Sequence, residues 1–281
     1  MEIDNIDKVA VGHYNIFVIK KDGTVWGLGY NRYGELGLGT SDLGDKYQFV
    51  QIPIDNVKNI YCGCCVQYAV KYDGTVYSTG WGNNGVLGTG SNQSYVFTKV
   101  DIDDVKKISI TYNTAFVLKN DGTLYSCGYN EHGESATGYT SYCLYKFYKV
   151  PLSNNVKIKD VVCGNFGHTM VLDTDNNLYS TGYNANGQLG IGNTNNINRF
   201  IKVPVTDVKK ILDLGYETSF ILKNDNTIWG CGMNTYGNLG LGYFSTRSTV
   251  FVQIPDLLYI PDGYALHSQK TLVNLLSANN L

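Results

Sequence analysis

The stretch Lys21-Asp22-Gly23-Thr24-Val25-Trp26-Gly27-Leu28-Gly29-Tyr30-Asn31, continued by Gly34-Glu35-Leu36-Gly37-Leu38-Gly39, decides the fold because it recurs along the chain. The turn aspartate reappears four more times, with spacings of 51, 48, 54 and 50 residues, at Asp73, Asp121, Asp175 and Asp225. Self-similarity at this period is typical of architectures in which each unit is one small sheet. The sequence therefore predicts an all-β chain of five similar units.

Each unit has the pattern of a β-hairpin followed by a glycine-rich loop. An apolar run precedes the turn in every copy, at residues 17–19, 68–70, 116–118, 170–172 and 220–222. Such runs suit strands that are buried on both faces. The turn is Asp-Gly in three copies and Asp-Asn in two, residues that accept the positive φ of a tight hairpin.

When the five copies are aligned, equivalent positions form columns of similar residues. These columns resemble the regulator-of-chromosome-condensation repeat, in which an Asp-Gly turn and an aromatic strand precede the pattern G-x-N-x-x-G-x-L-G-x-G. Residues 182–192 fit that pattern at every fixed position, and the resemblance covers roughly residues 5 to 255. It implies a β-propeller of about five four-stranded blades over residues 1–255 and a non-repeat C-terminal tail over 256–281. A closed ring and an open or intermolecularly completed array are both compatible with the repeats.

The chain departs from the family pattern in ways that bear on activity. The third copy has Ser135-Ala136 in place of Leu-Gly, and Thr111 stands where other copies have glycine. The eponymous family member has seven blades, a basic tail and an inserted wedge that helps to eject nucleotide from a small GTPase. Because copy number, tail and an insertion of that size differ here, the resemblance does not extend to the exchange activity.

Composition excludes several classes of function. The net charge of −2 has no basic or acidic block, so phosphate binding, and with it nucleic acid as a partner, is not expected. No apolar run approaches the length of a membrane span, and residues 1–5 do not begin a signal peptide. We therefore expect cytoplasmic synthesis, in which the 7 cysteines, an odd number, are reduced thiols.

Local motifs give no support for catalysis, a cofactor or a metal. The GxGxxG match at residues 80–85 lies within the repeat, and no helix is expected after it. The acidic run at residues 173–177 starts like a calcium loop but lacks the turn glycine, so it is interpreted as a hairpin turn. The cysteines at residues 62–65 have no second cluster at ligand spacing, and no serine, histidine and acid grouping stands out. The chain is therefore not expected to be an enzyme.

Partner contacts are expected where the copies differ, because repeat proteins keep their scaffold columns and vary their loops. The candidate residues within the glycine loops are Arg32, Tyr33, Glu131, His132 and Tyr236. Those in the third connection to the last strand are Tyr139, Tyr142 and Tyr145. Tyrosine gives a large contact area for little lost entropy, although rings that only cover blade edges would follow the same pattern.

The favoured function is a non-catalytic interaction or structural protein with a protein partner. The copies are rich in Asn, Tyr and Lys, as in residues 207–211, and this composition is similar to that of repeats from low-GC bacteria and their bacteriophages. That likeness favours a virion surface role, as a capsid decoration or tail-associated protein bound to virion proteins or to copies of itself. The alternative is a regulator of a small GTPase, or an inhibitor of another enzyme, that binds through a propeller face.

The tail over residues 256–281 supplies the last three candidate residues. Leu272, Leu275 and Leu276 would form a short apolar stripe on one side of a helical turn. Such a stripe has to be buried, either on the propeller itself or on another chain.

If the tail is a docking arm, deleting residues 262–281 should leave a folded propeller with a nearly unchanged melting temperature. The same deletion should abolish assembly with the partner or with other copies, as measured by size-exclusion chromatography. A truncated protein that aggregates or melts far lower would show instead that the tail is part of the fold.

Overall fold

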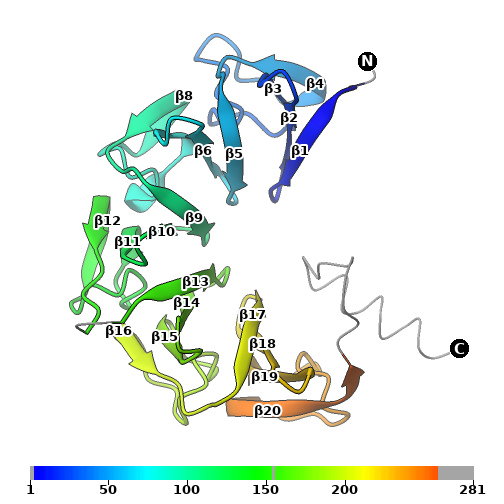
Figure 1. The fold of residues 1–281 in the computed structure, drawn as a ribbon, viewed down its shortest axis with the longest axis vertical. Helices are drawn as coiled ribbons and strands as arrows, with labels where there is room; N and C mark the ends of the chain where they lie inside the picture. Colours follow the sequence, from blue (N-terminus) through cyan, green and yellow to red (C-terminus); the bar gives the residue numbers. More distant parts are fainter. Residues whose placement is uncertain (1–2, 154–155, 259–281) are drawn as a thin grey trace, which may run out of the picture. The chain divides into compact units, whose positions relative to one another are not determined.

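The computed structural model describes residues 3–153 and 156–258 and shows five four-stranded antiparallel sheets, in which each strand pairs with the next along the chain (Figure 1). We call these sheets blades 1 to 5. The predicted all-β propeller fold, with five blades of four strands, is confirmed.

The strand bounds repeat closely from one blade to the next. Blade 1 comprises β1 (Ile6–Val11), β2 (Asn15–Lys20), β3 (Val25–Gly29) and β4 (Lys46–Ile52). Blade 2 comprises β5 (Val57–Cys62), β6 (Val66–Lys71), β7 (Val76–Trp81) and β8 (Gln93–Val100). Blade 3 comprises β9 (Val105–Ile110), β10 (Thr114–Lys119), β11 (Leu124–Asn130) and β12 (Ser141–Lys149). Blade 4 comprises β13 (Ile158–Cys163), β14 (His168–Asp173), β15 (Leu178–Gly182) and β16 (Ile197–Lys202). Blade 5 comprises β17 (Val208–Leu214), β18 (Thr218–Lys223), β19 (Thr227–Met233) and β20 (Arg247–Leu258).

Helix is almost absent from the described residues, where it is limited to the single 3₁₀ turn η1 (Asn83–Gly85). No helix in that part of the chain is both long and apolar enough to cross a membrane. The final strand β20 ends at Leu258, and residues 259–281, with Leu272, Leu275 and Leu276, lie outside the described residues. The division into a propeller and a tail therefore stays a prediction.

The chain forms two compact units, each built from successive blades. Unit 1 comprises Met1–Glu131 and Tyr139–Pro151, and unit 2 comprises His132–Gly138 and Leu152–Leu281. Within unit 1, β5 packs against β1 and β2, and β9 packs against β5. Within unit 2, β17 packs against β13 and β14. The second strand of each blade is almost wholly buried, as its apolar sequence predicts.

The hairpin turns owe their geometry to one aspartate and one residue of positive φ. In blade 1, Asp22 Oδ1 accepts hydrogen bonds from the backbone N–H of Thr24 at 3.0 Å and from its hydroxyl at 2.6 Å. These bonds lower the pKa of Asp22. The residue after the turn aspartate has a φ between 65° and 83° in every copy, at Gly23, Gly74, Gly122, Asn176 and Asn226. The Asp-Gly and Asp-Asn turns therefore form as predicted.

In blades 1 to 4 the glycine loop packs against the fourth strand of the next blade, an arrangement that we call the loop–strand contact. A Cβ atom at Gly34 would lie 2.6 Å from Tyr95 Cα, and one at Gly187 would lie 2.7 Å from Thr249 Cα. Both glycines also have positive φ, at 83° and 78°. The loop can therefore approach the neighbouring strand only because this column lacks a side chain.

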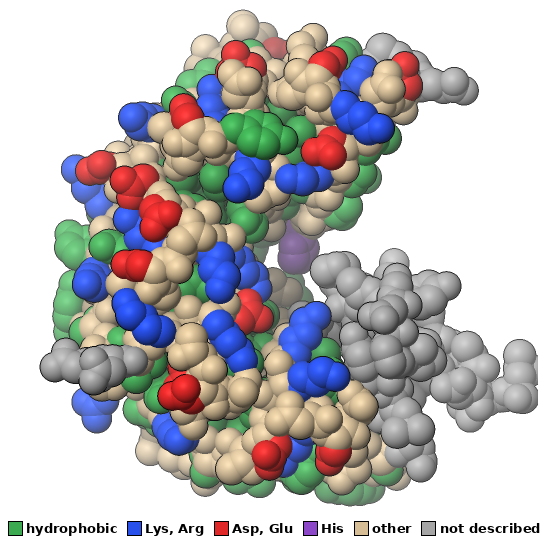
Figure 2. All heavy atoms as spheres, in the orientation of Figure 1, with side chains coloured by type: hydrophobic (Ala, Val, Ile, Leu, Met, Phe, Trp, Pro, Cys, Tyr) green, Lys and Arg blue, Asp and Glu red, His purple; other side chains and the backbone are tan. Residues whose placement is uncertain are grey.

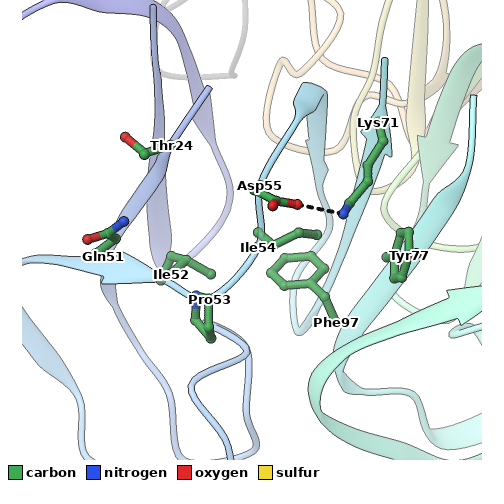
Figure 3. Close-up of a pocket in the computed structure, with 9 residues that line it drawn as sticks. All are labelled: Thr24, Gln51, Ile52, Pro53, Ile54, Asp55, Lys71, Tyr77 and Phe97. Carbon is green, nitrogen blue, oxygen red and sulfur yellow. Dashed lines mark hydrogen bonds and ion pairs between the residues drawn. The ribbon is translucent and has the colours of Figure 1, made fainter. Parts of the chain in front are cut away.

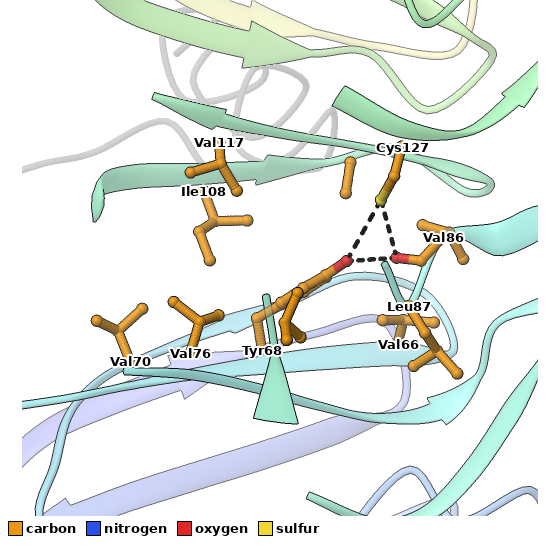
Figure 4. Packing of buried hydrophobic residues seen from close by; sticks show 11 residues of the cluster. Val66, Tyr68, Val70, Val76, Val86, Leu87, Ile108, Val117 and Cys127 are labelled. Atoms are coloured by element: carbon orange, nitrogen blue, oxygen red, sulfur yellow. Dashed lines mark hydrogen bonds between the residues drawn. The ribbon is translucent and has the colours of Figure 1, made fainter. Parts of the chain in front are cut away.

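Hydrophobic cores lie between blades 1 and 2 and between blades 2 and 3 in unit 1, and between blades 4 and 5 in unit 2. Figure 4 shows the core between blades 2 and 3, where Tyr68 and Cys127 are completely buried. The Tyr68 hydroxyl donates to the carbonyl of Val86 and lies 3.7 Å from the Cys127 sulfur. Burial raises the pKa of the Cys127 thiol to about 12, so the thiol stays neutral. This thiol behaves as a small core residue, as expected for its column.

One buried histidine lies in unit 2. His168 begins β14, is fully buried, and packs against Gly164, which leaves room for its ring. Burial lowers the pKa of His168 to about 4, and this effect outweighs the Thr218 backbone group, which favours the charged ring. The imidazole is therefore neutral in the folded protein at pH 7.

Gly187→Val should destabilise the protein by about 3 kcal/mol, because a β-branched residue combines positive-φ strain with overlap on Thr249. Gly192→Val is the matched control, since Gly192 has a φ of 85° but a Cβ there would meet nothing within 4 Å. The control should lose only about 1 kcal/mol in urea unfolding. Equal losses for the two variants would show that close approach to the strand does not constrain Gly187.

His168 should make the free energy of unfolding fall as pH decreases between 6.5 and about 4. In that window the unfolded chain binds the proton and the folded chain does not, which removes up to about 3 kcal/mol by pH 4. His168→Thr, which introduces the residue found there in blades 3 and 5, should flatten this pH dependence in thermal unfolding. The control His13→Thr, at an exposed histidine, should retain it.

Candidate functional site

Aromatic rings gather at one edge of blades 1 and 2, where the loops after β1, β3 and β7 meet. Ring centroids lie 6.0 Å apart for Tyr14 and Tyr30, and 6.1 Å for Tyr30 and Tyr33. Tyr33 then stacks on Trp81 of the next blade at 5.1 Å. We call these four residues the unit-1 cluster. Tyr14 is 59% exposed and Tyr33 is 40% exposed, so the cluster keeps much of its apolar surface in solvent.

Charged groups fix the loop that carries Tyr33. The Arg32 guanidinium lies over the Tyr30 ring at 5.8 Å and 3.5 Å from an Asp45 carboxylate oxygen. Glu35, which is completely buried, accepts the backbone N–H of Tyr33 at 2.9 Å. Burial raises the pKa of Glu35. This carboxyl group therefore anchors the loop and leaves the Tyr33 ring free to face outward.

A second set of rings lies in unit 2, which we call the unit-2 cluster. His132 meets Tyr183 edge-on at 5.6 Å, and Phe166 contacts Tyr183 at 5.5 Å and Tyr216 at 6.3 Å. Phe166 is 50% exposed and Tyr216 is 51% exposed. Glu134, in the column of Glu35, accepts the backbone N–H of His132 at 2.9 Å. In both units, therefore, a glutamate holds the loop by accepting the backbone N–H of the residue whose ring joins the cluster.

The other predicted residues that the structure describes lie in blades 3 and 5. Glu131 accepts a hydrogen bond from the hydroxyl of Tyr129, whose ring meets Tyr142 at 6.1 Å, so Glu131 and Tyr142 lie near one another. Tyr145 lies on β12, where its carbonyl accepts the N–H of Gly90. The other two predicted tyrosines are also exposed, Tyr139 by 50% and Tyr236 by 81%.

The sequence predicts Arg32, Tyr33 and His132 as candidate contacts but does not single out the rings that the structure places around them. The missed residues are Tyr14, Tyr30, Trp81, Phe166, Tyr183 and Tyr216. The sequence does contain a signal for some of these rings. The residue after the last glycine of the third strand is aromatic in four copies, as Tyr30, Trp81, Tyr129 and Tyr183. A column that is aromatic in most copies has the pattern of scaffold, although its rings lie at the surface.

A cavity of about 370 Å³ lies at the turn side of blades 1 and 2, lined by Pro53, Ile54, Phe97 and Tyr77 among others (Figure 3). Its charged side chains are Lys71 and Asp55, which form an ion pair at 2.9 Å that lowers the pKa of Asp55 and raises that of Lys71. Equivalent pairs join Lys20 to Asp4 and Lys119 to Asp103. The pair is thus a repeated scaffold feature, and the other polar side chains that line the cavity are Thr24 and Gln51.

Charge does not single out another site. On the face in Figure 2, blue and red side chains intermix over the described residues without a continuous patch of one sign. Within residues 3–153 and 156–258, no group of three His, Cys, Asp or Glu side chains is placed to hold a metal ion. The acidic residues near Asp173 form the hairpin turn, in which Asp173 accepts the backbone N–H groups of Asp175 and Asn177.

Comparison with known proteins agrees with the repeat structure. The regulator of chromosome condensation (RCC1) repeat profile matches residues 105–134, 158–188 and 210–238. The chain is 25% identical over 74% of its length to the ultraviolet-B receptor UVR8 of Arabidopsis thaliana, and 37% identical over 62% to an RCC1 domain-containing protein of Dictyostelium discoideum. It is 33% identical over 29% to the human regulator of chromosome condensation. The matches cover 36%, 30% and 20% of those relatives, so the chain spans about a third of their length or less.

Solved structures show the same fold at low sequence identity. Prp20p of Saccharomyces cerevisiae superposes on 89% of this chain and 63% of its own, with a TM-score of 0.79 and 20% identity. Human WBSCR16 covers 89% of this chain and 67% of its own, with a TM-score of 0.76 and 22% identity. The repeat profile, the relatives and the fold together show that this chain is built from RCC1-like repeats that form a β-propeller.

Proposed function

We propose that the chain is a non-catalytic protein-binding propeller, in which the unit-1 cluster and the unit-2 cluster each provide a binding surface. The observation that carries this proposal is the exposure of rings that already contact one another. Tyr14, Tyr33, Phe166 and Tyr216 are between 40% and 59% exposed, although each touches at least one further ring.

Rings that are already in contact suit binding for two physical reasons. Rings held by neighbours lose little conformational freedom when a partner covers them, so less of the gained contact energy is spent on ordering. Aromatic and arginine side chains also dominate the energetic centres of protein interfaces. Arg32, which lies over the Tyr30 ring, adds a planar donor group to the unit-1 cluster.

Relatives with this fold engage proteins. Yeast RCC1 (Prp20) has been crystallised with Kap60 bound to it, and Prp20p of Saccharomyces cerevisiae has binding properties to Gsp1p and histones. By this likeness a partner protein is the class of ligand expected here, and regulation of a small GTPase is the second candidate. Inhibition of another enzyme and the virion surface role stay predictions from the sequence.

The proposal is tested by cross-linking capture of the partner from the producing cells, with mass-spectrometric quantification. We compare wild type with Tyr14→Ser/Tyr33→Ser and with Phe166→Ser/Tyr216→Ser. Removal of two central rings should cost the complex at least about 2 kcal/mol, which corresponds to a loss of recovered partner of more than about tenfold.

The matched control is Tyr72→Ser/Tyr148→Ser, which removes two other exposed rings, at 64% and 49% exposure. The control should recover the partner as wild type does. Equal recovery with all three variants would contradict binding through the clusters. Recovery of a small GTPase, followed by nucleotide-release kinetics, would favour the second candidate, whereas recovery from intact virus particles would favour the virion role.

A further inference from the structure

The loop–strand contact occurs four times with one geometry. The last glycine of the loop donates its backbone N–H to a carbonyl of the fourth strand in the next blade at 2.7–2.9 Å, in the pairs Gly39–Tyr95, Gly90–Tyr145, Gly138–Asn198 and Gly192–Thr249. The first glycine of each of these loops is buried against the same strand. In blades 1 to 4 this glycine is Gly34, Gly85, Gly133 and Gly187. Each contact therefore needs two halves, a loop from one blade and a strand from another.

The glycine loop of blade 5 has the sequence of this contact without the strand. A Cβ at Gly237 would meet only the Phe244 ring, at 3.4 Å, among the described residues. One at Gly240 would meet Ile254 at 3.6 Å, whereas one at Gly190 would lie 2.6 Å from Phe251 of the next blade. Gly242 makes no equivalent backbone bond within the described part of the chain. Next to this loop, Tyr236 is 81% exposed and Phe244 is 80% exposed.

Within the described residues, the fourth strand of blade 1, β4, has no glycine loop of a preceding blade packed against it. In the register of the blades, Gly29 pairs with Lys46 as Gly80 pairs with Ser94, so Tyr47 occupies the place of Tyr95. Tyr47 is 91% exposed, whereas Tyr95 is partly covered by the loop of blade 1. Phe49 likewise occupies the place of Phe97, whose ring packs on Gly37. β4 therefore presents a strand edge of the kind that the other loops cover.

We propose that the glycine loop of blade 5 in one copy docks on β4 of a second copy, which forms a head-to-tail interface between chains. One sequence carries both halves of a contact that is seen four times in the structure, so a second copy offers a strand that is equivalent to the ones covered by the other four loops. Such an interface is heterologous, and each copy keeps one free half after the first contact forms. Association therefore continues until a ring closes or a filament grows.

Aromatic side chains extend the proposed interface. Tyr33 and His132 each contact a ring of the following blade, Trp81 and Tyr183. Tyr236 occupies the same loop position, and Tyr30 occupies the position of Trp81, so the docked loop places Tyr236 against Tyr30 of the second copy. The proposed contact lacks one hydrogen bond of the contact between blades 1 and 2. There, the hydroxyl of Thr79 in blade 2 donates to the carbonyl of Gly34, whereas the equivalent residue in blade 1 is Leu28. The new contact is therefore more apolar than the one between blades 1 and 2.

The test is sedimentation velocity of the full chain over about a hundredfold range of concentration. Wild type should shift from the mass of one chain to integer multiples of it. Tyr236→Glu, which blocks the loop, and Tyr47→Glu, which blocks the strand, should each remain a single chain. Both residues face solvent, so the variants should keep the wild-type melting temperature. Tyr72→Glu, at an exposed turn tyrosine, is the control and should associate as wild type does.

Mixing the two blocked variants separates this interface from any symmetric one. A Tyr47→Glu chain still has its loop, and a Tyr236→Glu chain still has its strand, so together they should form a complex that stops at two chains. Hydrogen exchange gives a readout that is independent of the variants. Peptides over residues 235–245 and 46–52 of wild type should gain protection with concentration, whereas those over 187–192 should not.

Several outcomes would overturn the proposal. A wild-type chain that stays a monomer throughout would mean that the loop and the strand are satisfied without a second copy. Association that survives both single variants would place the interface elsewhere. A mixture of blocked variants that does not pair would exclude the head-to-tail arrangement.

Discussion

The structure depends on one steric condition, that the backbone of a glycine loop lies directly against the strand of the next blade. No side chain fits between Gly34 and Tyr95, or between Gly187 and Thr249. A blade of four short strands buries little apolar surface alone, so its stability comes from the neighbours against which it packs. The loop–strand contact brings those neighbours into place and allows cores such as that around Tyr68 to form.

The same condition determines where function can lie. Because scaffold positions are held by backbone contacts, the residues between the loop glycines can vary without loss of the fold. A buried acceptor two residues further on, Glu35 or Glu134, binds the backbone N–H of Tyr33 or His132. The loop is thus fixed while its ring faces outward. The two clusters therefore combine loop residues that vary between copies, Tyr33 and His132, with rings from a position that is aromatic in most copies.

An array of such contacts has two ends, and the ends are chemically different. One end presents a glycine loop with exposed Tyr236, and the other presents a strand edge with exposed Tyr47. Exposed strand edges favour pairing with other chains unless something covers them. A repeat protein therefore has to satisfy its ends through another part of the chain, a further copy or a partner.

The sequence by itself determined the blade number, the strands, the hairpin turns and the glycine loops, because these depend on local φ preferences and on the burial of apolar runs. It also predicts Arg32, Tyr33 and His132 as candidate contact residues, since they differ between copies. Only the tertiary structure showed that Tyr33 stacks on Trp81 and that Phe166 contacts Tyr216, because these rings come from different repeats and meet through blade packing. The unmatched ends were likewise invisible in the sequence, where the last loop and the first outer strand carry the same pattern as their partnered counterparts.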